Sequence, residues 1–203
     1  MQRNLRRVFI GAELLIYLAF LLMDLLRVGD TTALTFIAIC LVGLMGARFA
    51  SANEIRWALV FTAAADVFLL VLDRHYPIGI SLFLLVQVLY AFYLDDVRGI
   101  VPRLICVALV VVLFYKTGAL ETLAAAYITL FFCNLIRAGV KARENPLFFF
   151  GLLLFFCCDL CVGMYHISTG ALYEFARVAM WGFYLPGQMM ILLSSWKAGG
   201  TKE

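Results

Sequence analysis

Apolar runs, each about as long as a bilayer is thick, follow one another along nearly the whole chain. A helix that crosses a bilayer needs about 20 consecutive, mostly apolar residues. Windows of that length give runs near residues 8–27, 32–48, 56–72, 77–94, 100–115, 119–136, 146–165 and 174–195. The runs are continuous rather than alternating in polarity, which favours helices over the strands of a barrel. We therefore predict an all-α fold, a polytopic transmembrane bundle of eight helices.

Composition excludes a soluble fold and several classes of partner. Of the 203 residues, 65% are hydrophobic and 14% are charged, whereas soluble domains average about 45–50% and about 25%. No long polar stretch separates the runs, so we interpret residues 1–203 as a single transmembrane domain. The basic residues are scattered between runs, which argues against a nucleic-acid surface. The six cysteines all lie within apolar runs, where they act as small hydrophobic residues.

The distribution of Lys and Arg predicts the orientation of the bundle, because cytoplasmic loops carry an excess of positive residues. Of the 16 such residues, all but four fall at the termini or on the connections that lie on the same side as the termini. The four on the opposite side are Arg27, Arg74, Lys116 and Arg177. We therefore expect an integral, multi-pass protein with both termini in the cytoplasm, placed in a bacterial inner membrane. The sequence does not predict an oligomeric state.

Prolines mark the starts of several helices. Asn145 is a plausible N-cap for the helix that follows it. Pro186 differs, because it lies well inside the last run and cannot donate to the carbonyl of Gly182. That carbonyl therefore needs a donor from elsewhere. The remaining prolines are expected in the first turn of a helix, where the missing N–H has no helical partner: Pro77, Pro102 and Pro146.

Two aspartates fall deep within apolar runs, Asp66 in the third and Asp159 in the seventh. An Asp at the centre of a spanning helix costs about 2.5–3.5 kcal/mol, and such residues usually mark function. The two helices are predicted to run in the same direction, which allows the carboxyls to face each other across a shared cavity. The alternative is a pair of protonated side chains that hydrogen-bond neighbouring helices. The aspartates also occupy matching positions in LVFTAAADVFLLV and LLLFFCCDLCVGM, so a four-plus-four parallel repeat is one interpretation.

Further polar residues lie at similar depth on helix faces. Tyr184 and Gln188 are spaced i, i+4 on either side of Pro186, and we expect them to line a cavity. Gln87 and Tyr90, spaced i, i+3, are expected on an opposing wall. In the sixth run, Tyr127 and Asn134 share a face, where an ordinary interhelical hydrogen bond and a role in the site are both open.

The first run carries Glu13, Tyr17 and Asp24 on one face, and we expect Asp24 to pair with Arg27 near the outer surface. Cys158 and Cys161 flank Asp159, but zinc takes about four Cys, His or carboxylate ligands and nothing completes such a set here. No phosphate-binding or dinucleotide-binding motif is present in the sequence. We therefore expect no metal and no other cofactor.

The motifs AADVFLLV, QVLYAFYL, FFCCDLCVG and FYLPGQMMILL, in the third, fourth, seventh and eighth runs, resemble the lysoplasmalogenase family of YhhN-like proteins. The resemblance covers nearly the whole chain in architecture, but few specific residues. Asp66 and Asp159 match the acidic residues of the family pattern, and Tyr184 and Gln188 match its Tyr and Gln. Two positions depart from the pattern. Gln87 stands where the family has a His, and residues 31 and 32 are Thr-Thr in place of Lys-Pro.

The resemblance implies hydrolysis of the vinyl ether bond of lysoplasmalogens, a class of lysophospholipid, to a fatty aldehyde and a glycerophospho-alcohol. The residues suit this chemistry, which requires a carboxylic acid that keeps its proton near neutral pH and a second, ionised carboxylate. A low-dielectric interior and a neighbouring carboxylate both favour that division. Asp66 and Asp159 are the candidate acid and base, in an order the sequence does not assign. Substrate contacts are predicted for Tyr184, Gln188, Gln87 and Tyr90.

Two other classes of function fit the same features. A transporter of lipids or small molecules would use the aspartates as proton relays. A non-catalytic lipid-binding protein would use the cavity alone, and Gln87 in place of the family's His is consistent with it.

Overall fold

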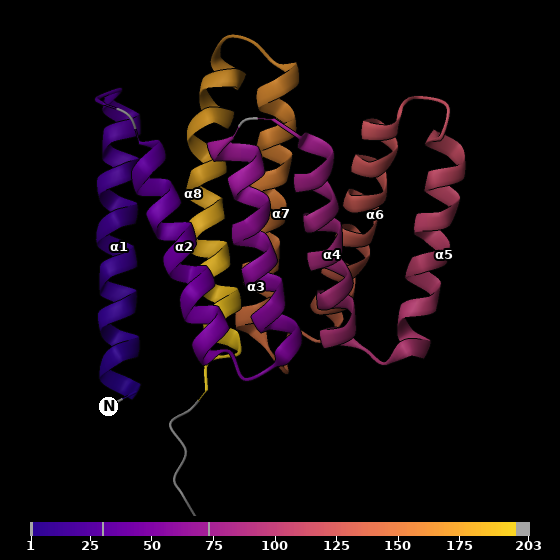
Figure 1. The fold of residues 1–203 in the computed structure, drawn as a ribbon, viewed down its shortest axis with the longest axis horizontal. Helices are drawn as coiled ribbons and strands as arrows, with labels where there is room; N and C mark the ends of the chain where they lie inside the picture. Colours follow the sequence, from indigo (N-terminus) through magenta and orange to yellow (C-terminus); the bar gives the residue numbers. More distant parts are fainter. Residues whose placement is uncertain (1, 30, 73, 198–203) are drawn as a thin grey trace, which may run out of the picture.

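The computed structural model describes residues 2–29, 31–72 and 74–197, which form a bundle of helices packed side by side (Figure 1). These residues contain no β-strand, only an isolated bridge between Ala50 and Trp196, and the all-α prediction is confirmed. Eight α-helices follow one another, and a short π-helix, η1, continues the third. Their bounds are α1 Gln2–Leu26, α2 Thr32–Phe49, α3 Asn53–Asp66, η1 Val67–Val71, α4 Tyr76–Leu94, α5 Val97–Phe114, α6 Ala119–Val140, α7 Pro146–Ile167 and α8 Ala171–Ser194.

Length and composition allow several of these helices to cross a membrane. Among the described residues, five segments meet both conditions: Asn4–Leu26, Tyr76–Leu94, Val97–Phe114, Ala119–Val140 and Pro146–Ile167. In α2 the apolar segment is shorter, Ala33–Phe49, and α3 has 14 residues before the π-helix begins. The chain therefore has the helices of an integral membrane protein, while a crossing by all eight stays a prediction.

The first and last helices meet at one end of the bundle. The rings of Phe9 in α1 and Trp196 just beyond α8 are stacked with centroids 5.8 Å apart. In Figure 1 the start of α1 and the end of α8 accordingly lie at the same edge. This arrangement agrees with an even number of passes and with termini on one side.

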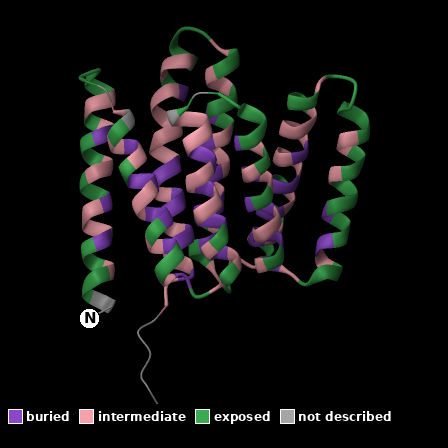
Figure 2. Ribbon diagram, in the orientation of Figure 1, coloured by how far each residue is buried: buried purple, intermediate pink, exposed green. Residues whose placement is uncertain are grey.

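Burial is concentrated in the centre of the bundle (Figure 2). The core draws on α1, α2, α3, α4, α6, α7 and α8. In contrast, α5 buries only Ile100 and Arg103 and lies at the edge in Figure 1, mainly against α6. Large apolar side chains on α5, such as Leu109 and Leu113, are exposed. A face of this kind is expected to lie against lipid.

The α7–α8 pair is the most closely packed in the bundle. A Cβ on Gly151 would lie 2.9 Å from the carbonyl oxygen of Gly187, and one on Gly187 would lie 3.0 Å from the carbonyl oxygen of Gly151. Small residues of this kind let two membrane helices approach backbone to backbone. The contact fixes the register of α7 against α8, and with it the relative depth of Asp159 and Tyr184.

The helix starts that Asn145 and the prolines mark follow the sequence predictions with one exception. The side chain of Asn145 accepts a hydrogen bond from the backbone N–H of Phe148 at 3.1 Å, so the predicted N-cap is confirmed. Pro77 and Pro146 lie in the first turns of α4 and α7. The placement of Pro102 was wrong, because Asp96 caps a helix that begins at Val97 and puts Pro102 inside α5.

The C-terminal end of α1 also differs from expectation. Asp24 pairs with Arg177 of α8, and Arg27 pairs with Glu174 at 2.8 Å, so the predicted Asp24–Arg27 pair was wrong. Because α1 ends at Leu26 and Arg27 has φ 55°, the helical spacing that would have joined them is absent. Both pairs instead link α1 and the turn after it to α8.

Candidate functional site

Asp66 is the last residue of α3, and its side chain lies inside the bundle with 4% of its surface exposed. The hydroxyl of Tyr184, from α8, donates a hydrogen bond to its Oδ2. Thr62 lies one turn earlier on the same face and is also buried. The structure therefore brings two of the predicted site residues, Asp66 and Tyr184, into direct contact.

The backbone changes its winding directly after Asp66. Residues Val67–Val71 form a π-helix, with the N–H of Leu72 donating to the carbonyl of Val67 at 2.9 Å. Single π-turns within α-helices are rare and occur often at functional sites. No polar or helix-breaking residue marks this turn in the sequence, because its five residues are uniformly apolar.

Asp159 in α7 has a tyrosine partner of its own. The hydroxyl of Tyr127, from α6, donates to Asp159 Oδ2. Asp159 is half-buried, whereas Asp66 is fully enclosed. For Tyr127 the sequence left a site role and an ordinary interhelical bond open. Its position in mid-run, where an unpaired hydroxyl is costly, was the available signal.

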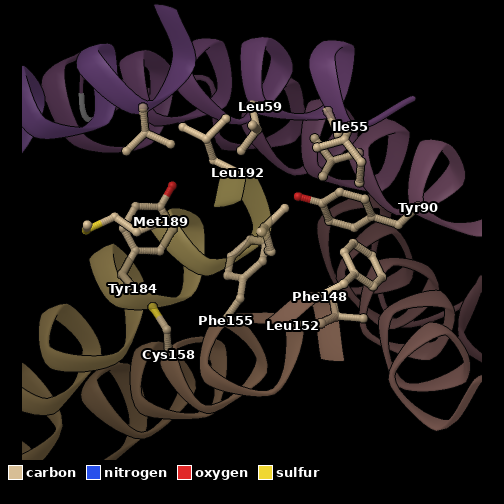
Figure 3. Close-up of a cluster of buried hydrophobic side chains, with 14 of the residues drawn as sticks. Ile55, Leu59, Tyr90, Phe148, Leu152, Phe155, Cys158, Tyr184, Met189 and Leu192 are labelled. Carbon is tan, nitrogen blue, oxygen red and sulfur yellow. The ribbon is translucent and has the colours of Figure 1, made fainter. Parts of the chain in front are cut away.

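The two tyrosine–aspartate pairs are neighbours within the bundle. No hydrogen bond joins the carboxyls directly within the described residues, but Asp66 and Asp159 are close enough to interact electrostatically. The ring of Phe155 lies 5.7 Å from that of Tyr184 and 5.7 Å from that of Phe83, which in turn lies 6.0 Å from that of Tyr127. A chain of aromatic contacts therefore runs from the ring of Tyr184 to the ring of Tyr127. Figure 3 shows Phe155, Tyr184 and Cys158 from this region.

Gln188 lies one turn beyond Tyr184 on α8, and 2% of its surface is exposed. Together with Thr62 and Tyr184 it lines a cavity of ≈ 10 Å³ between α2, α3 and α8. Its side-chain oxygen and nitrogen both lack hydrogen-bond partners within the described part of the chain. The expectation of a cavity beside Tyr184 and Gln188 is therefore met, but this cavity is far too small for a lipid chain.

Gln87 is drawn into a different network. Asn134 of α6 donates through Nδ2 to the backbone oxygen of Gln87 at 2.7 Å and to its Oε1 at 3.1 Å. Arg103 of α5 donates to Asn134 Oδ1 at 2.9 Å. Gln87 is fully buried and the described contacts do not join it to either aspartate, so the structure does not bring it together with the carboxyls.

Tyr90 is fully buried on α4, and in Figure 3 its hydroxyl points into the cluster on the side of Phe155 away from Tyr184. That hydroxyl is a neighbour of the Thr62 hydroxyl, although neither group makes a hydrogen bond of normal geometry among the described residues. Through Thr62, Tyr90 approaches the small cavity from the α4 side.

A charged cluster at the end of α4 was missed by sequence reasoning, which used its basic residues only to orient the bundle. Asp95 accepts hydrogen bonds from Arg103 and from Arg137, the latter at 2.7 and 2.6 Å, and Lys141 lies 3.2 Å away. The hydrogen bonds from Arg137 and the nearby Lys141 and Arg103 lower the pKa of Asp95 from 3.8 to about 2, against an opposing effect of burial. The cluster ties α4, α5 and α6 together at the end that holds the termini.

Two further features bear on ligands. The residues that the structure describes contain no group of three or more His, Cys, Asp or Glu placed to hold a metal ion. A larger groove of ≈ 430 Å³ lies between α4, α5 and α6, and neither aspartate is among its lining residues. Its lining is almost entirely apolar: Leu84, Val107, Val111, Tyr115, Ala119, Thr122, Leu123 and Ala126.

Comparison with known proteins agrees with the resemblance seen in the motifs. The sequence profile of the YhhN family matches residues 30–195, a range that contains both aspartates and both of their tyrosine partners. No curated protein sequence and no solved structure gives a significant match. The match spans most of the chain, and the protein therefore belongs to the YhhN family.

Proposed function

We propose that this YhhN-family protein is a membrane-embedded hydrolase that cleaves the vinyl ether bond of lysoplasmalogen-type lysophospholipids. The products are a fatty aldehyde and a glycerophospho-alcohol. The observation that carries the proposal is the pair of intramembrane carboxyls, Asp66 and Asp159, each held by a tyrosine hydroxyl from a neighbouring helix.

The chemistry of a vinyl ether explains why two carboxyls suit it. Hydrolysis begins with transfer of a proton to the carbon remote from the ether oxygen, which leaves an oxocarbenium ion that water then traps. One carboxyl must therefore act as a general acid and the other as a general base. A carboxyl in an apolar interior is suited to hold a proton at neutral pH, and its charged neighbour stabilises the cation.

The membrane setting supports the same proposal. We propose that all eight helices cross the bilayer with both termini in the cytoplasm, and that the one-chain substrate enters sideways from the lipid. A lipid that is already dissolved in the bilayer then reaches carboxyls at depth without passing through water.

The test is aldehyde release from lysoplasmenyl phosphoethanolamine by the purified protein in detergent. We expect turnover by the wild-type chain and its loss in Asp66→Asn and in Asp159→Asn. Asp24→Asn is the matched control, because Asp24 is also a carboxyl of a helix but pairs with Arg177 at the outer end. Undiminished aldehyde release in both site variants would remove this chemistry.

A second candidate is a non-catalytic lipid-binding protein, which the apolar groove between α4, α5 and α6 favours. It predicts co-purified lipid by mass spectrometry with no aldehyde formed. A proton-coupled transporter predicts substrate flux in proteoliposomes, again without product. The aldehyde assay distinguishes both from the hydrolase.

A further inference from the structure

The small cavity beside Tyr184 has polar groups that lack partners. Gln188 Oε1, Gln188 Nε2 and Thr62 Oγ1 are buried and make no hydrogen bond of normal geometry within the described residues, although the Tyr90 hydroxyl is a neighbour of Thr62 Oγ1. The side chains that surround the cavity are almost fully buried: Gln188 is 2% exposed, Thr62 3% and Tyr184 4%. Buried polar groups in native proteins are nearly always hydrogen-bonded, to protein or to ordered water.

The volume of the cavity matches one water molecule. It measures ≈ 10 Å³, and about 10–15 Å³ on this scale is the least space that holds a water. The rest of its lining is apolar, from Ile39, Val42 and Gly43 of α2 to Leu59 of α3. A single water there would find its partners only on the side of Thr62, Tyr184 and Gln188.

The cavity adjoins one of the two carboxyls. Tyr184 lines it and its hydroxyl donates a hydrogen bond to Asp66, and Thr62 precedes Asp66 by one helical turn. Tyr127, the partner of Asp159, is not part of the lining. Asp159 is also the more exposed carboxyl, and so the one that a lipid entering from outside the bundle reaches first.

We propose that this cavity holds the attacking water, that Asp66 is the base which receives its proton through Tyr184, and that Asp159 is the acid. Gln188 and Thr62 are then positioning residues, which orient the water without touching the substrate. The assignment rests on the proposed hydrolase function and orders two carboxyls that the sequence left interchangeable.

The steps balance with these roles. Protonated Asp159 gives its proton to the vinyl carbon remote from oxygen, the C=C π pair forms the new C–H bond, and the carbon beside oxygen becomes an oxocarbenium ion. The cavity water adds to that carbon, and its released proton passes through Tyr184 to the Asp66 carboxylate, leaving a hemiacetal. The hemiacetal hydroxyl then returns its proton to Asp159 as the C–O bond to glycerol breaks, and Asp66 protonates the departing oxygen.

Deuterium exchange separates the two roles. In D₂O, an oxocarbenium ion that waits for water can lose a proton back to Asp159 and return to substrate carrying deuterium at the vinyl carbon. Mass spectrometry of recovered lysoplasmenyl phosphoethanolamine measures this exchange beside aldehyde release. We expect wild type to release aldehyde with little exchange, Asp159→Asn to do neither, and Asp66→Asn to exchange without releasing aldehyde.

Variants of the two positioning residues should give the same kind of result as Asp66→Asn, with less aldehyde release and more deuterium exchange. Loss of one hydrogen bond to a developing charge costs about 1.5–3 kcal/mol, so Gln188→Leu and Thr62→Val should slow aldehyde release about 10- to 100-fold and raise exchange. Thr62→Ser, which keeps the hydroxyl, should restore the wild-type ratio of aldehyde to deuterium. Thr129→Val is the matched control, because among the described residues the Thr129 hydroxyl bonds only the carbonyl of Ala125 in its own helix, at 2.7 Å.

Each outcome decides the inference. Absence of aldehyde from the wild-type protein defeats the proposed function itself. With wild-type turnover intact, exchange in Asp159→Asn but not in Asp66→Asn reverses the roles of acid and base. Loss of both aldehyde release and deuterium exchange in both variants contradicts the assignment of separate roles. An unchanged ratio of aldehyde to deuterium in Gln188→Leu and Thr62→Val places the attacking water elsewhere. A purely structural role would slow turnover in these variants without placing deuterium in recovered substrate.

Discussion

The hydroxyl of Tyr17 in α1 donates a hydrogen bond to the carbonyl of Gly182 in α8 at 3.2 Å. That carbonyl is the one Pro186 leaves without a helical donor, since proline has no N–H. A bond between two helices thus replaces a bond within one, as membrane helices with an internal proline require. The sequence predicted the orphaned acceptor, and the structure supplies its donor from α1, 165 residues earlier in the chain.

This relationship predicts a coupling between two substitutions. Tyr17→Phe should lower the free energy of unfolding by about 0.6–1.7 kcal/mol, the range measured for interhelical hydrogen bonds in membranes. In the Pro186→Ala background the cost should shrink, because a backbone N–H then serves the Gly182 carbonyl. Thermal unfolding in detergent across the double-mutant cycle measures the coupling, and equal costs in the two backgrounds would contradict it.

The tyrosines that hold the aspartates should matter more for turnover than for stability. Tyr184→Phe and Tyr127→Phe each remove one donor to a carboxyl oxygen, so we expect aldehyde release to fall about 10- to 100-fold in each, from about 1.5–3 kcal/mol per bond. Tyr173→Phe is the control, since the Tyr173 hydroxyl donates to that of Tyr165 at 3.0 Å near the C-terminal end of α7. Equal activity in all three variants would show that the tyrosine–aspartate bonds are only structural.

The charged cluster at the end of α4 should lose its contribution to stability when its single carboxylate, Asp95, is replaced. The side chains of Asp95 and Arg103 are each 7% exposed, and removing one partner of a buried pair typically costs about 3–5 kcal/mol. We expect Asp95→Asn to lower thermal stability accordingly. Asp96→Asn is the neighbouring control, because Asn caps a helix about as well as Asp. Similar melting temperatures for the two variants would argue against the cluster as a lock between α4, α5 and α6.

The same cluster sets a pH dependence at acid pH. Because the pKa of Asp95 is lowered from 3.8 to about 2 on folding, its contribution to stability is complete above the unfolded value and is lost as pH falls toward the folded one. Wild-type stability should therefore include a component that disappears between about pH 4 and pH 2. Asp95→Asn should lack that component. An identical acid profile for the two proteins would contradict the assignment.

The α7–α8 contact should not accept a methyl group. Gly151→Ala and Gly187→Ala each place a Cβ about 3 Å from backbone atoms that cannot move independently, and overpacking of this kind costs about 1–3 kcal/mol. Gly163→Ala, also in α7, is the control, because a Cβ there meets nothing within 4 Å. We expect lower melting temperatures for the first two variants only, and a drop of similar size at Gly163 would rule out the steric cause.

Much of the fold was predictable because a bilayer imposes a length on every apolar run. The runs near 119–136 and 146–165 correspond to α6 and α7, and Asn145 marked a helix start through a local hydrogen bond. Pro102 misled because a first turn was assumed to begin at the proline, whereas the cap at Asp96 lies several residues earlier. A capping side chain marks the helix start in both cases, but the apolar residues that follow do not determine at which residue the helix begins.

Partners between helices were less predictable, because helical periodicity identifies a face but not the helix that the face meets. Asp66 and Asp159 stood out as polar residues at depth, yet their bonds to Tyr184 and Tyr127 depend on how four helices are arranged. The π-helix at Val67–Val71 left no trace in the sequence. Asp24 was assigned to its neighbour Arg27 in the chain, while the fold supplied Arg177 instead.

The two tyrosine–aspartate bonds have a consequence for how the bundle opens. One crosses the seam between α3 and α8, the other the seam between α6 and α7, while α7 and α8 are held backbone to backbone at Gly151 and Gly187. Separation along either seam must therefore break one of these latches, and the strength of each latch depends on whether its aspartate carries a charge. Entry of a lipid between these helices is thereby linked to the protonation of the two aspartates that it would contact.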